Sequence, residues 1–351
     1  MAAGGHIAWF EEIGLGDREH VGGKGGSLGE LTRAGIAVPA GYVVRTPAFE
    51  RFLAAIEREA PVRAAVVALP ADDLEAITAC SRALRRRIEA TELPGELLEE
   101  LTAAHERLLY DGTEQPVAVR SSATCEDSAD ASFAGLQDTY LWVKGAAQML
   151  RRVRSCWASL YSVESISYRL KHGFIEERVA MGVVVQKMVD ARTSGVMFTR
   201  SPTTGDRSVV TIEGAWGLGS AVVGGEVTPD RWVLSKIGAE ISVREISDKH
   251  VQHAPAANGG VESVAVGAER RSVPCLSDEE LKELGALARQ VERHYGRAQD
   301  IEWAIDRSGA ILLLQSRPET VWSAREAGPI AKREEDPLMH LMSIFGTRKC
   351  P

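Results

Sequence analysis

The residues best suited to chemistry lie in the segment 116–143. It opens with a β-branched run that is expected to form a strand ending at Arg120, and small hydroxyl residues follow: Ser121, Ser122 and Thr124. A guanidinium group donates two parallel hydrogen bonds to one anion, and rotating hydroxyls fill the remaining lone pairs of that anion. The pattern predicts a phosphate site. The alternative is a surface ion pair between Arg120 and Glu126 or Asp127.

A second candidate for phosphate binding is Lys24, which four glycines surround within residues 21–35. A helix is expected to start at about Ser27 and to stop at Gly35, so the glycine loop stands at a helix N-terminus. Such a loop exposes backbone N–H groups and adds the positive end of the helix dipole. The segment does not match the Walker A pattern G-x-x-x-x-G-K-[ST]. The alternative is a plain glycine turn.

A third set of polar residues lies in the segment 300–318, where two β runs flank Ser308-Gly309 and predict a hairpin. A two-residue turn there places Glu302 opposite Gln315, with Arg317 on the same face, because side chains alternate with a period of two. A carboxylate and an amide oxygen suit Mg²⁺, and the adjacent guanidinium suits a phosphate. The alternative is the polar outer face of a meander.

The elements that must position these groups change from helical to β character along the chain. Amphipathic spacing and capping residues predict helices over 46–59, 73–90, 95–110, 146–171 and 277–295. Ser277 and Glu280 have the spacing of a capping box at the start of the last helix. Strands are predicted over 179–185, 194–200 and from 209 into a glycine-rich stretch. Gln186 follows the first of these strands, where it either lines an adenine pocket or stays an exposed amide.

The bulk properties restrict the partners and the setting. With 351 residues, 44% of them apolar and 26% charged, the chain is long enough for two or three domains with a core. A formal net charge of −8 argues against a nucleic acid or an anionic membrane as partner. Five scattered cysteines without a C-x-x-C pair suggest neither a disulfide framework nor a thiolate zinc site, so a cytoplasmic location is expected. We expect no secretion leader and no membrane span.

These motifs together resemble the nucleotide-binding part of the phosphoenolpyruvate synthase and pyruvate phosphate dikinase family, which also includes rifampin phosphotransferase. The matching motifs are V-G-G-K-G-G-S-L-G-E-L from Val21, R-S-S-A-T from Arg120, F-A-G-L-Q-D-T-Y from Phe133, G-V-M-F-T from Gly195, W-G-L-G from Trp216, T-P-D from Thr228, D-I-E-W from Asp300 and Q-S-R-P from Gln315. The resemblance implies an α+β fold of the ATP-grasp type. It would comprise an N-terminal α/β lobe (1–200), a second, β-rich lobe (201–322) closing over ATP, and a linker with an apolar docking tail (323–351).

The resemblance also implies roles for individual residues. ATP would be contacted by Lys24, Arg120, Thr139, Glu213 and Arg317, the adenine by Gln186, and the phosphates by backbone at Gly135, while Glu302 and Gln315 would hold Mg²⁺. The catalytic residues among these would be Lys24, Arg120 and Arg317. Cys125 departs from the small aliphatic residue that is more usual in the family, which could make the site sensitive to oxidation.

Members of the family pass a phosphoryl group from ATP to a histidine on a swivelling domain, which then visits a second active site. We expect this chain to contain neither of these parts, because few residues follow Pro318 and no histidine has glycine-rich, hydroxyl-flanked neighbours. The chain then resembles the ATP-binding subunit of a split phosphotransferase such as phenylphosphate synthase, inactive without its partner. That partner would carry the histidine and the acceptor site. The acceptor would be a phenol or aromatic alcohol, with pyruvate as the alternative, and the apolar segment 337–346 would dock on a partner. The competing hypothesis is a nucleotide-sensing module without transfer activity.

Overall fold

The computed structural model describes residues 5–109, 115–124, 138–176, 179–320 and 322. The helices are α1 (Arg18–Arg33), α2 (Thr46–Glu57), α3 (Arg63–Val67), α4 (Leu74–Ala90), α5 (Gly95–Leu108), α6 (Gly145–Ser159), α7 (Val163–His172), α8 (Ser220–Val223), α9 (Ala268–Arg271) and α10 (Asp278–Tyr295). The strands are β1 (Ile7–Trp9), β2 (Gly41–Val44), β3 (Val117–Ala123), β4 (Thr139–Val143), β5 (Met181–Lys187), β6 (Ala191–Phe198), β7 (Val209–Trp216), β8 (Asp230–Ser235), β9 (Ile241–Glu245), β10 (Val251–Pro255), β11 (Val261–Ala265), β12 (Gln299–Asp306) and β13 (Ile311–Pro318). The expected α+β class is confirmed.

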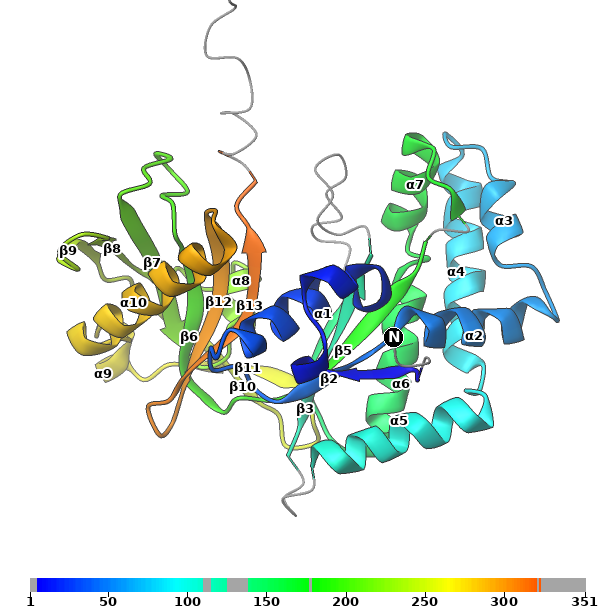
Figure 1. Ribbon diagram of the computed structural model, residues 1–351, viewed down its shortest axis with the longest axis horizontal. Coiled ribbons are helices and arrows are strands. Elements are labelled where there is room, and N and C mark those ends of the chain that lie inside the picture. The colour runs from blue at the N-terminus through cyan, green and yellow to red at the C-terminus, as the bar shows by residue number, and fades with distance from the viewer. Residues whose placement is uncertain (1–4, 110–114, 125–137, 177–178, 321, 323–351) are drawn as a thin grey trace, which may run out of the picture. The chain divides into compact units, whose positions relative to one another are not determined.

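The first sheet is antiparallel, with the strand order β1-β2-β5-β3-β4. One face packs on a core that includes α2, α4, α5 and α6, and the other face packs on α1 (Figure 1). Along β5, Val183 and Val185 belong to the core formed with α2, α4, α5 and α6, and Val184 belongs to the core formed with α1. The unbroken valine run in β5 follows from this burial on both faces, which removes the usual alternation of apolar and polar side chains.

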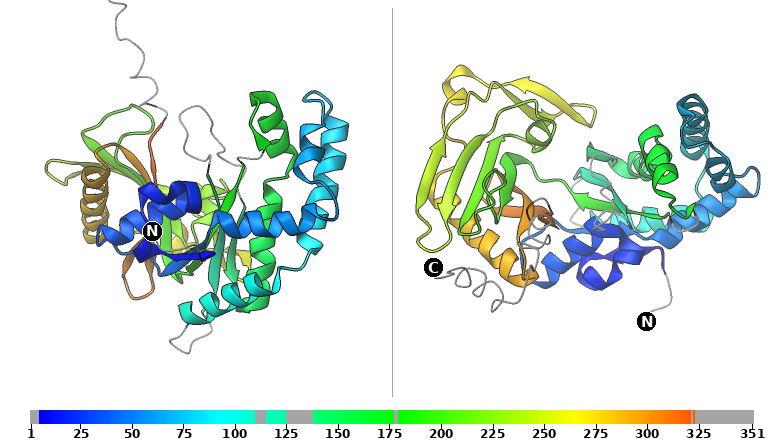
Figure 2. Two further views of the ribbon diagram at one scale, coloured as in Figure 1. Left: turned by 45° about the vertical axis from the view of Figure 1, so that its right-hand side comes forward. Right: turned by 90° about the horizontal axis from the view of Figure 1, so that it is seen from above.

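The second sheet is also antiparallel and has the order β13-β12-β6-β7-β8-β9. Helix α10 covers one face with Leu281, Leu284, Ala288 and Val291, which pack with Trp232 and Trp303 of the sheet (Figures 1 and 2). The spacing of these α10 residues produces one apolar stripe along the helix, as burial on one side requires. The opposite face of the sheet carries Glu213, Glu302 and Gln315 of the candidate site together with apolar residues such as Ala304 and Leu314.

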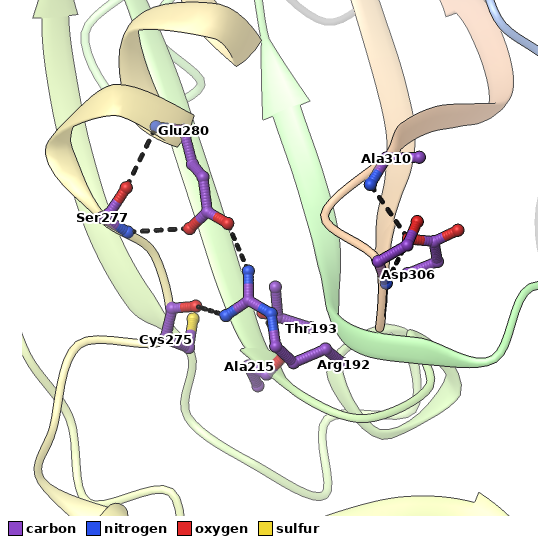
Figure 3. A network of polar contacts seen from close by, with 9 residues as sticks. Arg192, Thr193, Ala215, Cys275, Ser277, Glu280, Asp306 and Ala310 are labelled. Carbon is purple, nitrogen blue, oxygen red and sulfur yellow. Dashed lines mark hydrogen bonds and ion pairs between the residues drawn. The ribbon is translucent and has the colours of Figure 1, made fainter.

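A polar network fixes the start of α10 on the second sheet (Figure 3). The Ser277 hydroxyl accepts a hydrogen bond from the Glu280 amide at 3.2 Å, and the Glu280 carboxylate accepts one from the Ser277 amide at 2.9 Å. This confirms the predicted capping box. The same carboxylate forms an ion pair with Arg192 on β6, whose Nη1 also donates to the Cys275 carbonyl at 3.4 Å. The helix cap therefore also ties α10 to the strand beneath it.

Helix α1 connects the two sheets. Its residues Val21 and Leu28 pack with Val43 and Val184 of the first sheet, while Leu31 belongs to the core of the second. The helix also packs against β13. Glycine permits the close approach of α1 to the first sheet: a Cβ at Gly25 would lie 2.9 Å from a methyl carbon of Val43 on β2. Groups carried by α1 are thus held where the two sheets meet.

Two predicted boundaries differ from the structure. The single helix expected over 146–171 is two helices, α6 and α7, because Ser162 takes an extended conformation and caps the second helix by accepting a hydrogen bond from the Ser165 amide at 3.1 Å. The helix expected from about Ser27 already begins at Arg18, with a break at Gly22. The sequence pattern did not predict this earlier start, because four glycines lie between residues 22 and 26 and glycine is a poor helix former.

The change from the first sheet to the second falls between Lys187 and Ala191, ahead of residue 200, where the boundary was expected. The domain limits themselves stay predictions. Residues 319–351 form a separate unit, and within its described part the Glu319 carboxylate accepts a hydrogen bond from the Trp322 amide at 2.7 Å. None of the helices in the described ranges combines the length and the apolar character that crossing a membrane takes.

Candidate functional site

The site is built on the hairpin of β12 and β13. Its register pairs Glu302 with Gln315, which confirms the predicted pairing, and Asp300 with Arg317. The predicted turn was wrong, however, because three residues connect Asp306 to Ala310 instead of two. A bulge between Glu302 and the next residue of β12 shifts the register back by one residue. The two irregularities compensate, so the polar pairs form as expected.

Arg120 on β3 reaches across to this hairpin. Its Nη2 donates to Glu302 Oε2 at 2.9 Å and to Gln315 Oε1 at 2.6 Å, and its Nη1 donates to the Leu314 carbonyl at 2.8 Å. The guanidinium is buried, and its Nε has no hydrogen-bond partner among the described residues. One arginine thus links the two sheets and still holds an unused donor.

The position of Arg120 differs from the expectation in one respect. It lies within β3, which continues to Ala123, and not at a strand end. Strand β3 pairs with β5 along its whole length, so the Arg120 side chain has a rigid base. The alternative partners Glu126 and Asp127 lie outside the described residues, as do Gly135 and Cys125.

Lys24 lies just after the break in α1. Gly22 has φ +73°, and a Cβ there would lie 2.0 Å from the Ser122 carbonyl oxygen, so only glycine fits. The Ser122 hydroxyl accepts a hydrogen bond from the Gly25 amide at 3.1 Å and donates one to the Val21 carbonyl at 2.8 Å. The glycine segment is therefore held against β3 at Ser122, two residues after Arg120. Lys24 is largely buried, with 8% of its surface exposed.

A cavity of about 430 Å³ lies between the two sheets. It is lined by four of the predicted site residues: Arg120, Thr139, Gln186 and Glu302. Lys24, Glu213, Gln315 and Arg317 are not among its lining residues. The apolar part of its wall is contributed by Leu141, Val189, Leu218, Ala304 and Leu314. A concave site with apolar walls and a few convergent polar groups is the usual form of a small-molecule site.

Gln186 is buried in this cavity's wall, and its Nε2 donates to the Pro39 carbonyl at 3.2 Å. A carbonyl oxygen can only accept, so the contact fixes the side-chain orientation and leaves Oε1 as an acceptor for a ligand. The alternative of an exposed amide is wrong. The Pro39 contact could not be found from sequence because it joins a backbone carbonyl to a residue 147 positions away.

Glu213 lies in the same row of the second sheet as Glu302, with Val196 between them. Residues directly opposite each other on neighbouring strands point to the same face, so both carboxylates belong to the face opposite α10. Burial raises the pKa of Glu213 above its ordinary value, and Arg231 on β8 partly opposes this rise. Glu213 is thus a partly desolvated carboxylate, whereas the Glu302 carboxylate forms an ion pair with Arg120 at 2.9 Å.

Arg317 has more exposed surroundings than Arg120. Its side chain is 55% exposed, and its Nε lies 3.6 Å from Asp300 Oδ2. It shares the hairpin face with Gln315, as predicted. An exposed guanidinium at this distance is weakly held and can turn toward an anion at small cost.

The residues present fit a Mg²⁺ ion that arrives with phosphate groups. Glu302 Oε2 and Gln315 Oε1 lie close together, because both accept a hydrogen bond from Arg120 Nη2, and each oxygen keeps a further lone pair that could face a metal ion. In the described ranges, no cluster of three or more His, Cys, Asp or Glu residues could form a metal cage. Mg²⁺ usually takes one or two carboxylates together with waters and substrate phosphates, so two protein oxygens are a sufficient set.

Comparison with known proteins supports the same interpretation. Residues 18–337 match the family described as pyruvate phosphate dikinase, AMP/ATP-binding domain. The chain is 41% identical to a phosphoenolpyruvate synthase of Aeropyrum pernix over 94% of its own length and 44% of that protein. It is 39% identical to a rifampicin phosphotransferase of a Streptomyces species over 95% of its own length and 38% of that protein. It therefore spans less than half the length of these curated relatives.

A solved structure, the D-alanyl-alanine synthetase A of Vibrio cholerae, aligns with 77% of this chain and 64% of its own at 10% identity, with a TM-score of 0.26. That value is too low to add to the assignment, which rests on sequence. The family match covers Lys24, Arg120 and the whole β12–β13 hairpin, and of these Arg120 and Glu302 line the cavity. By this match, the chain belongs to the pyruvate phosphate dikinase AMP/ATP-binding domain family.

Proposed function

We propose that the chain binds Mg·ATP in the cavity between its sheets and supplies a phosphoryl group to a histidine on a partner subunit. The observation that supports this most is the convergence of Arg120, Glu302 and Gln315, which joins an anion donor to two hard-oxygen ligands. Phosphoryl transfer depends mainly on positioning and on stabilising charge, and these groups are suited to both.

The chain's own residues would divide the work. Gln186 Oε1 would accept a hydrogen bond from the adenine amine, at the end of the cavity formed by β5. Arg120 and Arg317 would stabilise negative charge on the phosphates, and Lys24 would add a third cation from α1. A bound Mg²⁺, held by Glu302 and Gln315, would neutralise phosphate charge.

The acceptor histidine is proposed to come from a partner, because no histidine of the described ranges lines this cavity. His105 is buried, and burial lowers its pKa, so it is unsuited to meet a phosphate. His6 and His294 are held by carboxylates, at 2.7 Å from Glu100 and 2.7 Å from Glu30. The final acceptor would be a phenol or an aromatic alcohol, with pyruvate as the alternative that the names of the phosphoenolpyruvate synthases suggest.

The test is nucleotide turnover with and without partner. The purified chain should bind Mg·ATP and convert it negligibly to AMP, whereas addition of the protein that co-purifies with it should produce a phosphohistidine on that protein. Rapid steady-state formation of AMP by the pure chain would refute the split arrangement. Tight ATP binding with no transfer to any co-purifying protein would favour the nucleotide-sensing module instead.

The partner contact has its own test. The apolar segment 337–346 lies outside the described residues, and its docking role is proposed from sequence alone. Deletion from Glu334 onward should preserve ATP binding and weaken the complex with the partner. Equal loss of both would contradict a docking role.

A further inference from the structure

Three polar side chains outside the predicted site form a chain of hydrogen bonds beside the cavity. Ser220 Oγ lies 2.7 Å from His253 Nδ1, and His253 Nε2 lies 3.0 Å from Glu226 Oε2. Ser220 is the first residue of α8 and lines the cavity. His253 lies on β10, and Glu226 is exposed to solvent. The Leu218 amide donates to the His253 carbonyl at 3.0 Å, which holds β10 against this segment.

The chemistry of these groups determines the direction of every hydrogen bond in the chain. The Glu226 carboxylate can only accept, so His253 Nε2 carries a proton. In the neutral imidazole, Nδ1 is then an acceptor, and Ser220 must donate its hydroxyl proton to it. Ser220 therefore turns its oxygen lone pairs toward the cavity. It offers a ligand an acceptor and has no proton left to donate.

The proposed ligand has few groups that could use such an acceptor. Phosphate oxygens accept only, so they gain nothing from Ser220 and are suited to the arginines. The adenine amine is a donor, but Gln186 Oε1 on the first sheet already offers it an acceptor. The remaining donors of ATP are the two ribose hydroxyls. The wall around Ser220 contains Gly219 and Gly224, which leave room for a sugar to approach the backbone.

We propose that Ser220 is a ribose subsite, which accepts a hydrogen bond from the 2′- or 3′-hydroxyl of the bound nucleotide. His253 is a positioning residue whose Nδ1 accepts the hydrogen bond from the Ser220 hydroxyl, and Glu226 holds the histidine in the required tautomer. The inference rests on the proposed binding of ATP in this cavity. It predicts that the chain distinguishes ribonucleotides from the corresponding deoxy analogue.

The test measures equilibrium binding of ATP, 2′-deoxy-ATP and 3′-deoxy-ATP at pH 8, with Mg²⁺ present. Wild-type protein should bind the analogue that lacks the contacted hydroxyl about three- to tenfold more weakly than ATP, the effect of one ordinary hydrogen bond. In Ser220→Ala this ratio should fall to about one, because the acceptor is gone. Ser220→Thr keeps a hydroxyl and should restore part of the discrimination.

Two controls separate a ligand contact from a structural role. Ser242→Ala removes a hydroxyl that donates to the Val233 carbonyl at 3.0 Å on the same sheet, remote from the cavity, and should keep the wild-type ratio. The ¹⁵N spectrum of His253 should show the Nε2–H tautomer in wild type. Glu226→Gln permits the other tautomer, because its amide can donate to Nε2, and should reduce the discrimination.

The outcomes are distinct. If both deoxy analogues bind wild type as tightly as ATP, or if Ser220→Ala keeps the discrimination, the ribose subsite is refuted while ATP binding stands. If Ser220→Ala weakens all three nucleotides equally, the serine is structural and the subsite is also refuted. Failure of wild type to bind ATP would overturn the proposed function, and the subsite with it.

Discussion

The two arginines assigned to phosphate binding should differ sharply in what they contribute to stability. Arg120 is buried and makes three hydrogen bonds to the β12–β13 hairpin. Arg317 is 55% exposed and lies 3.6 Å from its nearest carboxylate oxygen, on Asp300. Replacing each by alanine therefore removes the same guanidinium group from very different surroundings.

The cost of Arg120→Ala follows from its three acceptors. Glu302 has a side chain that is 34% exposed, so water can solvate its carboxylate once the arginine is gone. Gln315 is only 7% exposed and would lose its partner in a buried place, which costs about 1–3 kcal/mol. Because part of the Glu302 contact is also lost, we expect Arg120→Ala to lower the free energy of unfolding by about 2–3 kcal/mol in total. This is less than the roughly 3–5 kcal/mol that breaking a fully buried ion pair costs. Arg317→Ala should cost about 0.5 kcal/mol or less.

The assay is urea unfolding followed by tryptophan fluorescence, with thermal unfolding as a second measurement. For Arg120→Ala the melting temperature should fall by roughly 4–8 °C or somewhat less in a chain of this size. Both variants should lower phosphoryl transfer to the partner more than they weaken ATP binding, because charge on the phosphates grows in the transition state. Equal destabilisation by the two substitutions would refute the reasoning from burial, and wild-type transfer rates would refute the assignment to phosphate.

Three further expectations follow from individual side chains. Glu302→Ala should raise the Mg²⁺ concentration needed for transfer, with partial rescue by excess metal, and Gln315→Ala should do so more mildly; an unchanged Mg²⁺ titration would contradict the metal role. Glu213→Gln should raise the melting temperature at pH 7, because burial raises the Glu213 pKa and the folded state then holds its carboxylate at a cost; this gain should disappear below the ordinary pKa of 4.5, where folded and unfolded states are both protonated. Arg169→Met should cost about 3–5 kcal/mol in urea unfolding, because it leaves the Glu176 carboxylate buried and unpaired, and adding Glu176→Leu should recover much of the loss.

The β12–β13 hairpin shows how far local sequence patterns reach. Counting outward from an assumed two-residue turn placed Glu302 opposite Gln315, and this pair forms only because the β-bulge offsets the error in the turn length. The turn length was wrong, since Asp306 accepts hydrogen bonds from the Ser308 and Ala310 amides and favours a three-residue turn. The compensating bulge carries no local signal in the sequence that pattern reasoning could use.

Contacts between distant parts of the chain could not be predicted in the same way. Arg120 and Glu302 are 182 residues apart, and nothing in either local pattern identifies the other as its partner. The prediction that both serve one site came from the family resemblance. Ser220 and His253 were missed altogether, because each looks like an ordinary polar residue in its own segment, and only the packing of β10 beside α8 brings them together.

The hydrogen bonds of Arg120 also bear on how it can serve two purposes. A guanidinium group has five N–H donors, and three of them are used on Glu302, Gln315 and the Leu314 carbonyl. Nε–H, which has no partner among the described residues, and one N–H of Nη1 are left for a phosphate. Arg120 can therefore bind an anion without releasing the hairpin. Because the same group orients Glu302 and Gln315, Arg120→Ala should disturb the proposed metal and phosphate binding together, and it would also remove this contact between the two sheets.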